Sequence, residues 1–262
     1  MTRTPFHHVR RGSGPPLVLI HGIGHHHQGW DPVARLLDDT FEVIAVDTPG
    51  FGRSEPLPGP YDIGAYVDAF VAWLGEQGIK RPHVAGNSMG GGIALELARR
   101  GAVRSVCAIS PVGFWADSER GFAQIFLGIL NGMPAALRPL VVSLGRTAAG
   151  RAVLGSVVFA RPWRMPGDEF ASLLTDLWAS PVFAATLEAF DAYDFDRAEE
   201  LDGTPVTIAW GSRDRLLLYG PQSQRARERL PNARHVTLPG LGHTPFFDDP
   251  GMVASVIRAA AS

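Results

Sequence analysis

The chain contains little of several features that would narrow its function quickly. One of its 262 residues is a cysteine, so no disulfide can form within the chain and cysteine content does not constrain the redox compartment. The formal net charge of −2 gives no electrostatic reason to expect nucleic acid or an anionic membrane as a partner. No apolar run approaches the roughly 20 residues that span a bilayer, and the first residues lack the apolar segment of a signal peptide. We therefore expect a cytoplasmic protein that binds neither nucleic acid nor membrane.

Short apolar runs alternate with helical stripes along most of the chain. The runs are apolar at successive positions rather than at every second one, which is typical of parallel strands covered on both faces. They occupy residues 17–20, 41–46, 83–85, 103–109, 206–210 and 235–238. Cys107 lies within the fourth run, where a small core hydrophobe is the simplest interpretation. The alternation predicts an α/β fold with a three-layer, mostly parallel sheet, in which ligands bind beyond the carboxyl ends of the strands.

The alternation lapses between residues 114 and 195. This stretch is rich in Phe, Trp, Met, Leu and Ala, and residues 121–130 and 169–178 have helical patterns. A stretch of this length inside a compact domain is usually functional. We interpret residues 114–195 as a helical cap over the active edge of the sheet, inserted between the sixth and seventh core strands. Residues 1–113 and 196–262 would then form the core domain.

The most informative motif is the Gly-Asn-Ser-Met-Gly of residues 86–90, which lies between strand-like residues 82–85 and helical residues 91–100. A serine hydroxyl is a poor nucleophile unless it is exposed, oriented and deprotonated by a neighbour. A tight strand-to-helix turn would expose and orient Ser88. Glycines two positions before and after the serine are needed there, because a Cβ at either position would clash. The motif predicts Ser88 as a catalytic nucleophile.

The other groups that a nucleophilic serine needs follow other predicted strands. His243, after the last apolar run, is the candidate base, and Asp214, after the preceding run, is the carboxylate that would orient it. Asp47 also ends a strand, but the Pro-Gly that soon follows is typical of a turn, so Asp214 is preferred. The predicted oxyanion donors are the backbone amides of Met89, at the start of a helix, and Ile23, between two glycines.

Five motifs in this order resemble the α/β-hydrolase superfamily. They are residues 21–24, 47–54, 86–90, 211–214 and 242–243. The resemblance covers nearly the whole chain and implies cofactor-free hydrolysis through an acyl-serine intermediate. The opening hairpin of that fold is shortened here, so we expect only residues 7–10 as an edge strand. Haloalkane dehalogenase and epoxide hydrolase chemistry is disfavoured, because those enzymes carry aspartate at the elbow.

The substrate class stays open between related hydrolases. A small-to-medium apolar ester or lactone is the first interpretation. The elbow also resembles that of carbon–carbon bond hydrolases acting on ring-fission diketones, which tend to carry tryptophan where this chain has Thr244. Those enzymes use a cap arginine, for which the candidates are Arg138, Arg146, Arg151, Arg161 and Arg164. A third interpretation is a ligand-binding receptor that keeps the triad and turns over slowly.

Residues near the predicted strand ends and aromatic residues of the cap are the candidates for substrate contact. They are Gly22, Gly24, His25, Asn87, Phe114, Trp115, Phe126, Trp163, Trp178 and Phe246. We expect no metal at the three successive histidines of residues 25–27, because their side chains point in different directions and zinc sites draw on spaced ligands. Asp248 and Asp249, before Pro250, are predicted to cap the last helix.

Overall fold

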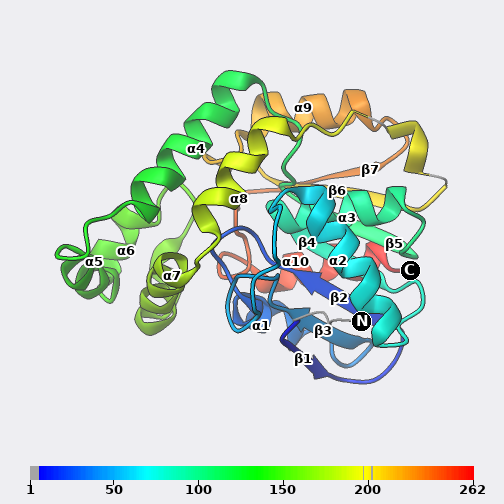
Figure 1. Ribbon diagram of the computed structural model, residues 1–262, viewed down its shortest axis with the longest axis horizontal. Coiled ribbons are helices and arrows are strands. Elements are labelled where there is room, and N and C mark those ends of the chain that lie inside the picture. Colours follow the sequence, from blue (N-terminus) through cyan, green and yellow to red (C-terminus); the bar gives the residue numbers. More distant parts are fainter. Residues whose placement is uncertain (1–5, 197, 202) are drawn as a thin grey trace.

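A seven-stranded sheet forms the centre of the computed structural model, which describes residues 6–196, 198–201 and 203–262 (Figure 1). The strands follow one another in the sheet in the order β1-β3-β2-β4-β5-β6-β7. β1 is antiparallel to β3, and every other neighbouring pair is parallel. The strands are β1 His8–Arg11, β2 Pro16–Ile20, β3 Glu42–Val46, β4 His83–Asn87, β5 Ser105–Ile109, β6 Val206–Gly211 and β7 Arg234–Leu238. The predicted mostly parallel sheet is confirmed, and the edge strand predicted at residues 7–10 is β1, which the structure shows to be antiparallel.

Both faces of the sheet are covered, which explains why its strands are apolar at successive positions. In β2, Val18 and Ile20 belong to one hydrophobic cluster, and Leu17 and Leu19 belong to another on the opposite face. The first cluster includes side chains of α2 (Ile63–Glu76), α3 (Met89–Arg99) and α9 (Tyr219–Arg229). The second includes side chains of α1 (Asp31–Ala34) and α10 (Pro250–Ala260). The result is a three-layer arrangement.

Five α-helices lie between β5 and β6 and project from one side of the sheet (Figure 1). They are α4 Asp117–Asn131, α5 Arg138–Gly145, α6 Ala148–Leu154, α7 Gly167–Ala179 and α8 Phe183–Ala189. Short 3-10 turns complete the described elements, at His27–Trp30, Pro162–Arg164, Phe190–Ala192 and Ala198–Leu201. The helical segment, as we call residues 114–195, follows the fifth strand rather than the predicted sixth. The count differs because a single described strand, β1, precedes β2.

Among the described residues, no single helix is long and apolar enough to cross a membrane. One bent pair, α7 together with residues Phe183–Ala192, meets the length and composition criteria jointly, with 79° between its two halves. Phe170, Leu174 and Phe183 of this pair are buried against the rest of the protein.

Candidate active site

Ser88 alone forms the turn between β4 and α3. Its backbone angles are φ 57° and ψ −118°, in the left-handed region that a non-glycine residue adopts only under constraint. The surrounding hydrogen bonds supply that constraint. The Ser88 amide donates to the Ile109 carbonyl at 3.0 Å, and the Ser88 carbonyl accepts from the amides of Gly92 and Val112 at 3.1 and 3.2 Å. The backbone is therefore held on both sides, and the side chain lines a cavity.

The glycines of the elbow are required by close packing. A Cβ on Gly86 would lie 2.0 Å from the carbonyl oxygen of Gly90, and a Cβ on Gly90 would lie 2.3 Å from the carbonyl oxygen of Ile20. Both distances are far below van der Waals contact, and in both cases the obstacle is backbone that cannot rotate away. The steric reason predicted for these two glycines is confirmed.

His243 and Asp214 form a buried pair beside the elbow. His243 Nδ1 lies 2.8 Å from Asp214 Oδ2, and the two residues are only 3% and 5% exposed. The other oxygen, Asp214 Oδ1, accepts the amides of Leu216 at 3.0 Å and Leu217 at 2.9 Å. A carboxylate that accepts from Nδ1–H keeps the proton on that nitrogen and leaves Nε2 able to accept another. Ser88 and His243 line the same cavity.

The loop that carries His243 is tied to the elbow by Asn87. The Asn87 side-chain amide donates to the carbonyl oxygens of His243 at 2.9 Å and Ile109 at 3.1 Å. Asn87 lines the cavity, as predicted for a substrate contact, but both its N–H groups are occupied by protein carbonyls. Asn87 therefore holds the His243 loop next to the Ser88 turn.

Asp248 has a role that the sequence analysis missed. Its Oδ2 accepts the amides of Gly242 at 2.8 Å and Ala160 at 3.0 Å, and its Oδ1 accepts the amide of Arg161 at 2.7 Å. It thus fastens the His243 loop to the helical segment. Asp249 alone caps α10, by accepting the Met252 amide at 3.0 Å, so the prediction that both aspartates cap this helix is wrong for Asp248. No sequence pattern distinguishes the two, because Ala160 and Arg161, which only Asp248 binds, lie 88 and 87 residues away in the chain.

The loop after β2 approaches the elbow closely. A Cβ on Gly22 would lie 3.1 Å from Ser88 Cβ, so only glycine lets the loop pass at this distance without displacing its neighbour. Among the described residues, the amides of Ile23 and Met89 donate no hydrogen bond to a backbone or side-chain acceptor. Met89 follows Ser88 in the chain and Ile23 follows Gly22, and free backbone amides of this kind can bind an oxyanion.

The cavity above Ser88 is largely apolar and has a volume of about 120 Å³. The core supplies its polar end, with Ser88, His243 and Thr244. The helical segment supplies aliphatic and aromatic walls: Leu127, Leu130, Met133, Val141, Leu154, Val158, Phe159, Phe170, Leu173, Leu174 and Leu177. The segment therefore lines the space next to Ser88.

The structure brings some of the predicted contact residues to this cavity and leaves others elsewhere. Gly22, Gly24, His25 and Asn87 line it, as does Ile23. Trp115 lines a smaller hollow on another side of Ser88 and donates its indole N–H to the Tyr193 carbonyl.

Five predicted aromatic contacts lie outside the cavity. Phe114 packs against Phe195 and Trp210, Phe246 lies 3.9 Å from Trp30 by ring centroids, and Phe126 stacks on Phe122. The Trp178 indole donates to the Leu130 carbonyl beneath Arg138, and Trp163 is 53% exposed. These predictions are corrected: leucines and valines make most of the wall. Composition identifies apolar helices but does not say which face of each helix points inward.

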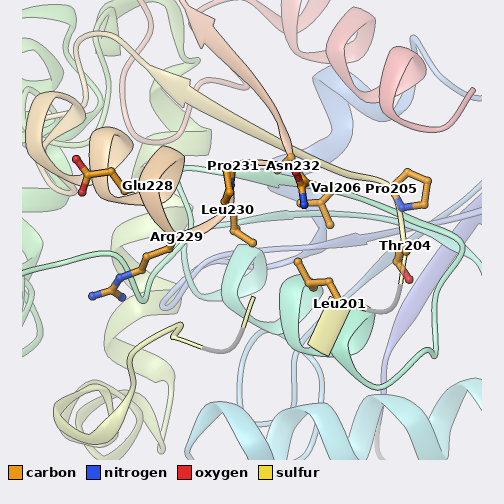
Figure 2. Close-up of a pocket in the computed structure, with 11 residues that line it drawn as sticks. Leu201, Thr204, Pro205, Val206, Glu228, Arg229, Leu230, Pro231 and Asn232 are labelled. Atoms are coloured by element: carbon orange, nitrogen blue, oxygen red, sulfur yellow. The ribbon is translucent and has the colours of Figure 1, made fainter. Parts of the chain in front are cut away.

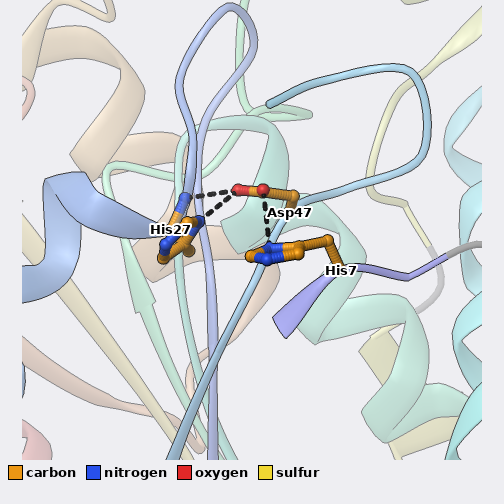
Figure 3. Close-up of side chains that lie close together, drawn as sticks. All are labelled: His7, His27 and Asp47. Carbon is orange, nitrogen blue, oxygen red and sulfur yellow. Dashed lines mark hydrogen bonds and ion pairs between the residues drawn. The ribbon is translucent and has the colours of Figure 1, made fainter. Parts of the chain in front are cut away.

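Behind the loop after β2, Asp47 joins two histidines (Figure 3). Asp47 Oδ1 accepts the His27 amide at 2.7 Å and lies 2.9 Å from His27 Nδ1. Asp47 Oδ2 accepts the Arg53 amide at 3.0 Å and lies 3.2 Å from His7 Nδ1. His7, His27 and Asp47 form the one group of potential metal ligands found among the described residues. Because N–H groups of His27 and Arg53 already surround the carboxylate, Asp47 acts as a hydrogen-bonded hub that holds this loop, while His7 Nδ1 contacts it without forming a hydrogen bond.

Burial and hydrogen bonding together set the protonation of Asp47 and of His21 near it. Burial by itself raises the pKa of Asp47, but the His27 hydrogen bond and the nearby His21 outweigh it and hold that pKa below its usual range. Burial lowers the pKa of His21 to about 4. His21 Nε2 accepts the Thr48 amide at 2.9 Å, which also requires the neutral ring. Further along the loop, His26 Nε2 lies 2.9 Å from Asp176 Oδ2 and so links the loop to α7.

A second, larger hollow of about 660 Å³ lies away from these residues (Figure 2). It is lined by residues at the start of β6, including Pro205 and Val206, and by the turn before β7, including Pro231 and Asn232. Asp214 and His243 follow the opposite ends of the same two strands. Size alone therefore does not locate the chemistry.

Residues 17–256 match the model of the alpha/beta hydrolase family, and the chain belongs to that family. It is a hydrolase. Over 270 residues it is 30% identical to the pimeloyl-[acyl-carrier protein] methyl ester esterase of Aeromonas hydrophila, covering 95% of this chain and 96% of that protein.

Solved structures with similar folds include two hydrolases of different chemistry. A bacterial membrane phospholipase A superposes with a TM-score of 0.78 at 29% identity, covering 98% of this chain and 82% of that one. The meta-cleavage product hydrolase of Pseudomonas fluorescens superposes with a TM-score of 0.75 at 20% identity, covering 98% and 95%. The second likeness is one of fold alone.

Proposed function

We propose that the protein is a serine hydrolase of apolar carboxylic esters or lactones, acting through an acyl-serine intermediate. The observation that carries the proposal is the placement of Ser88 and His243 on one apolar cavity, with His243 held through Nδ1 by the buried Asp214. An elbow serine, a histidine able to accept a proton and a carboxylate that orients it are the three parts of a serine-hydrolase triad.

In the first half-reaction, His243 Nε2 takes the proton from Ser88 Oγ as the oxygen attacks the substrate carbonyl. The carbonyl oxygen becomes an oxyanion, which the amides of Ile23 and Met89 bind. Collapse expels the alcohol, which takes the proton from His243. In the second half-reaction, water gives a proton to His243 and attacks the acyl-serine, and the same groups release the carboxylic acid and restore Ser88.

The cavity indicates the kind of acyl group. Its polar atoms lie at the Ser88 end, and leucine, valine and phenylalanine form most of the rest. Its volume of about 120 Å³ is comparable to the engineered apolar cavity of about 150 Å³ that binds benzene. We propose that residues 114–195 act as a cap and that a medium alkyl or aryl acyl group occupies the space beneath it.

Ester hydrolysis is favoured over carbon–carbon cleavage by the arginines of the cap. None of the five candidates is among the residues that line the cavity. Arg151, the buried one, donates to the carbonyls of Gly145 and Arg146. Arg138 donates to the Met133 carbonyl and lies over the Trp178 ring. The relatives at 29–30% identity named above are an esterase and a phospholipase.

Replacing the serine tests the proposal. Ser88→Ala should abolish turnover of p-nitrophenyl esters of increasing chain length while leaving the urea unfolding midpoint nearly unchanged. The matched control is Ser105→Ala, a buried serine in β5 that hydrogen-bonds His83; it should keep wild-type turnover. A Ser88→Ala protein with wild-type activity would refute the mechanism.

The same panel separates the alternatives. Adding lactones and a vinylogous diketone to the p-nitrophenyl esters tests cleavage of cyclic esters and of carbon–carbon bonds. A serine-directed phosphonate should label one equivalent of Ser88 whether the protein is an ester hydrolase, a carbon–carbon bond hydrolase or a slow receptor. Fast steady-state turnover together with this labelling indicates an enzyme, whereas labelling without turnover indicates a slow receptor.

A further inference from the structure

The helical segment carries most of the exposed large apolar side chains of the protein. Eleven such side chains occur among the described residues, and eight of them fall between residues 122 and 163. They are Phe122, Ile125, Ile129, Leu137, Leu140, Leu144, Val153 and Trp163, which we call the outer apolar face. Ile125 and Ile129 are each 66% exposed, and Val153 is 76% exposed. Exposed apolar side chains concentrated in one segment make that segment a candidate interaction surface, whereas single exposed apolar residues are ordinary.

The exposed side chains follow helical spacing. Phe122, Ile125 and Ile129 are separated by three and four residues in α4, so they share one face of that helix. The opposite side of α4 is also apolar: Leu127 and Leu130 line the cavity above Ser88. A surface helix of a globular protein normally has one apolar face. The second apolar face of α4 has no partner within the described chain.

The charge of this region differs from that of the whole protein. Residues 132–166 contain five arginines and no aspartate, glutamate or lysine, although the full chain has a net charge of −2. Arg138, Arg161 and Arg164 form no ion pair with a carboxylate in the described part of the chain, while Arg146 pairs with Asp168. The region is therefore basic and apolar at once, and it includes a half-exposed tryptophan.

We propose that the outer apolar face binds an anionic lipid surface. Exposed Leu, Ile and Trp side chains beside arginines are the composition of segments that lie in the headgroup region of a bilayer, with apolar groups inserted shallowly and cations at the phosphates. The arginines select a negatively charged surface over a second copy of the same basic face, which would repel it. The near-neutral net charge of the chain conceals this local separation.

The helices that carry the outer apolar face also carry walls of the cavity. Ile129, Leu140 and Val153 are exposed, and their direct neighbours Leu130, Val141 and Leu154 line the space above Ser88. Binding through this face would hold the cavity close to an apolar ester dissolved in the lipid. This consequence rests on the proposed function, whereas lipid binding itself does not.

Vesicle sedimentation tests the proposal directly. Wild-type protein should pellet with phosphatidylglycerol/phosphatidylcholine vesicles and remain in the supernatant with pure phosphatidylcholine, and 0.5 M salt should weaken the binding. The triple variant Ile125→Ser/Ile129→Ser/Leu140→Ser should bind anionic vesicles at least about tenfold more weakly than wild type, since it removes inserted apolar area. The matched control is Leu36→Ser/Val71→Ser, two residues 41% and 39% exposed outside the helical segment, which should bind like wild type.

Three outcomes would overturn the proposal: no binding of wild type to anionic vesicles, equal binding by the triple variant, or equal loss in the control. Sedimentation velocity of the lipid-free protein adds a fourth. A wild-type dimer that the triple variant converts to monomer, with no vesicle binding, would assign the face to self-association. Ser88→Ala should bind vesicles like wild type, so failure of lipid binding and failure of the proposed hydrolysis are separately visible.

Discussion

Replacing Asp214 by asparagine separates two roles that its two oxygens play. Oδ2 lies 2.8 Å from His243 Nδ1, and Oδ1 accepts the amides of Leu216 and Leu217. Asparagine keeps one oxygen, which can still accept the two amides, and turns an NH₂ group toward the histidine. His243 must then accept at Nδ1 and carry its proton on Nε2, the nitrogen that has to accept the proton of Ser88.

The expected loss is large in catalysis and small in stability. The wrong tautomer lowers kcat by a factor on the order of 10⁴, which corresponds to about 5.5 kcal/mol of activation free energy. Because the two amide bonds survive, the free energy of unfolding should change by less than about 1 kcal/mol. Asp214→Ala should lose as much activity, and also about 1–3 kcal/mol of stability for each of the two amides left unpaired.

The assay combines steady-state ester hydrolysis with urea unfolding of both variants. Asp47→Asn is the control, because Asp47 is the other buried carboxylate that ends a strand and it contacts His27 and His7 instead of His243. Activity of Asp214→Asn within tenfold of wild type would refute the assignment of Asp214. If Asp47→Asn, but not Asp214→Asn, lowered kcat by a factor on the order of 10⁴, Asp47 would be the residue that orients the histidine.

The other predictions concern buried groups. Because burial lowers the pKa of His21 from 6.5 to about 4, the unfolded chain binds this proton and the folded chain does not between those values. Stability should therefore fall by about 2 kcal/mol on going from pH 7 to pH 5, and urea unfolding of His21→Asn should show a flatter dependence; an equal slope would contradict this. Asn87→Asp removes both donors to the Ile109 and His243 carbonyls, so kcat should fall at least about tenfold and stability by about 1–3 kcal/mol for each bond; wild-type values for both would show that the loop is held by other contacts. Burial raises the pKa of Cys107 to about 12, so iodoacetamide should label it only in denaturant, and labelling of the native protein would show that β5 opens.

Local sequence signals predicted the framework and the candidate triad. Runs of successive apolar residues predicted the parallel strands because a strand covered on both faces must be apolar on both. The two elbow glycines were predictable because backbone approaches within 2.0 and 2.3 Å of where their Cβ atoms would lie. Two helices of the helical segment, at residues 121–130 and 169–178, were predicted and correspond to α4 and α7. Which side of each helix points toward the cavity was not predictable. The cavity walls were therefore assigned to Phe114, Phe126 and other aromatic residues that pack elsewhere.

By itself, the sequence determined the α/β class and the order in which polar motifs follow the predicted strands. It also identified Ser88, Asp214 and His243 as candidates for the triad. These depend on residue type and short spacing, which the chain carries locally. Only the tertiary structure decided that Asn87 ties the histidine loop to the elbow, that Asp248 ties it to the helical segment, that aliphatic residues line the cavity, and that eight large apolar side chains of that segment are exposed. Each of these depends on groups far apart in the chain, and distances between such groups exist only once the chain has folded.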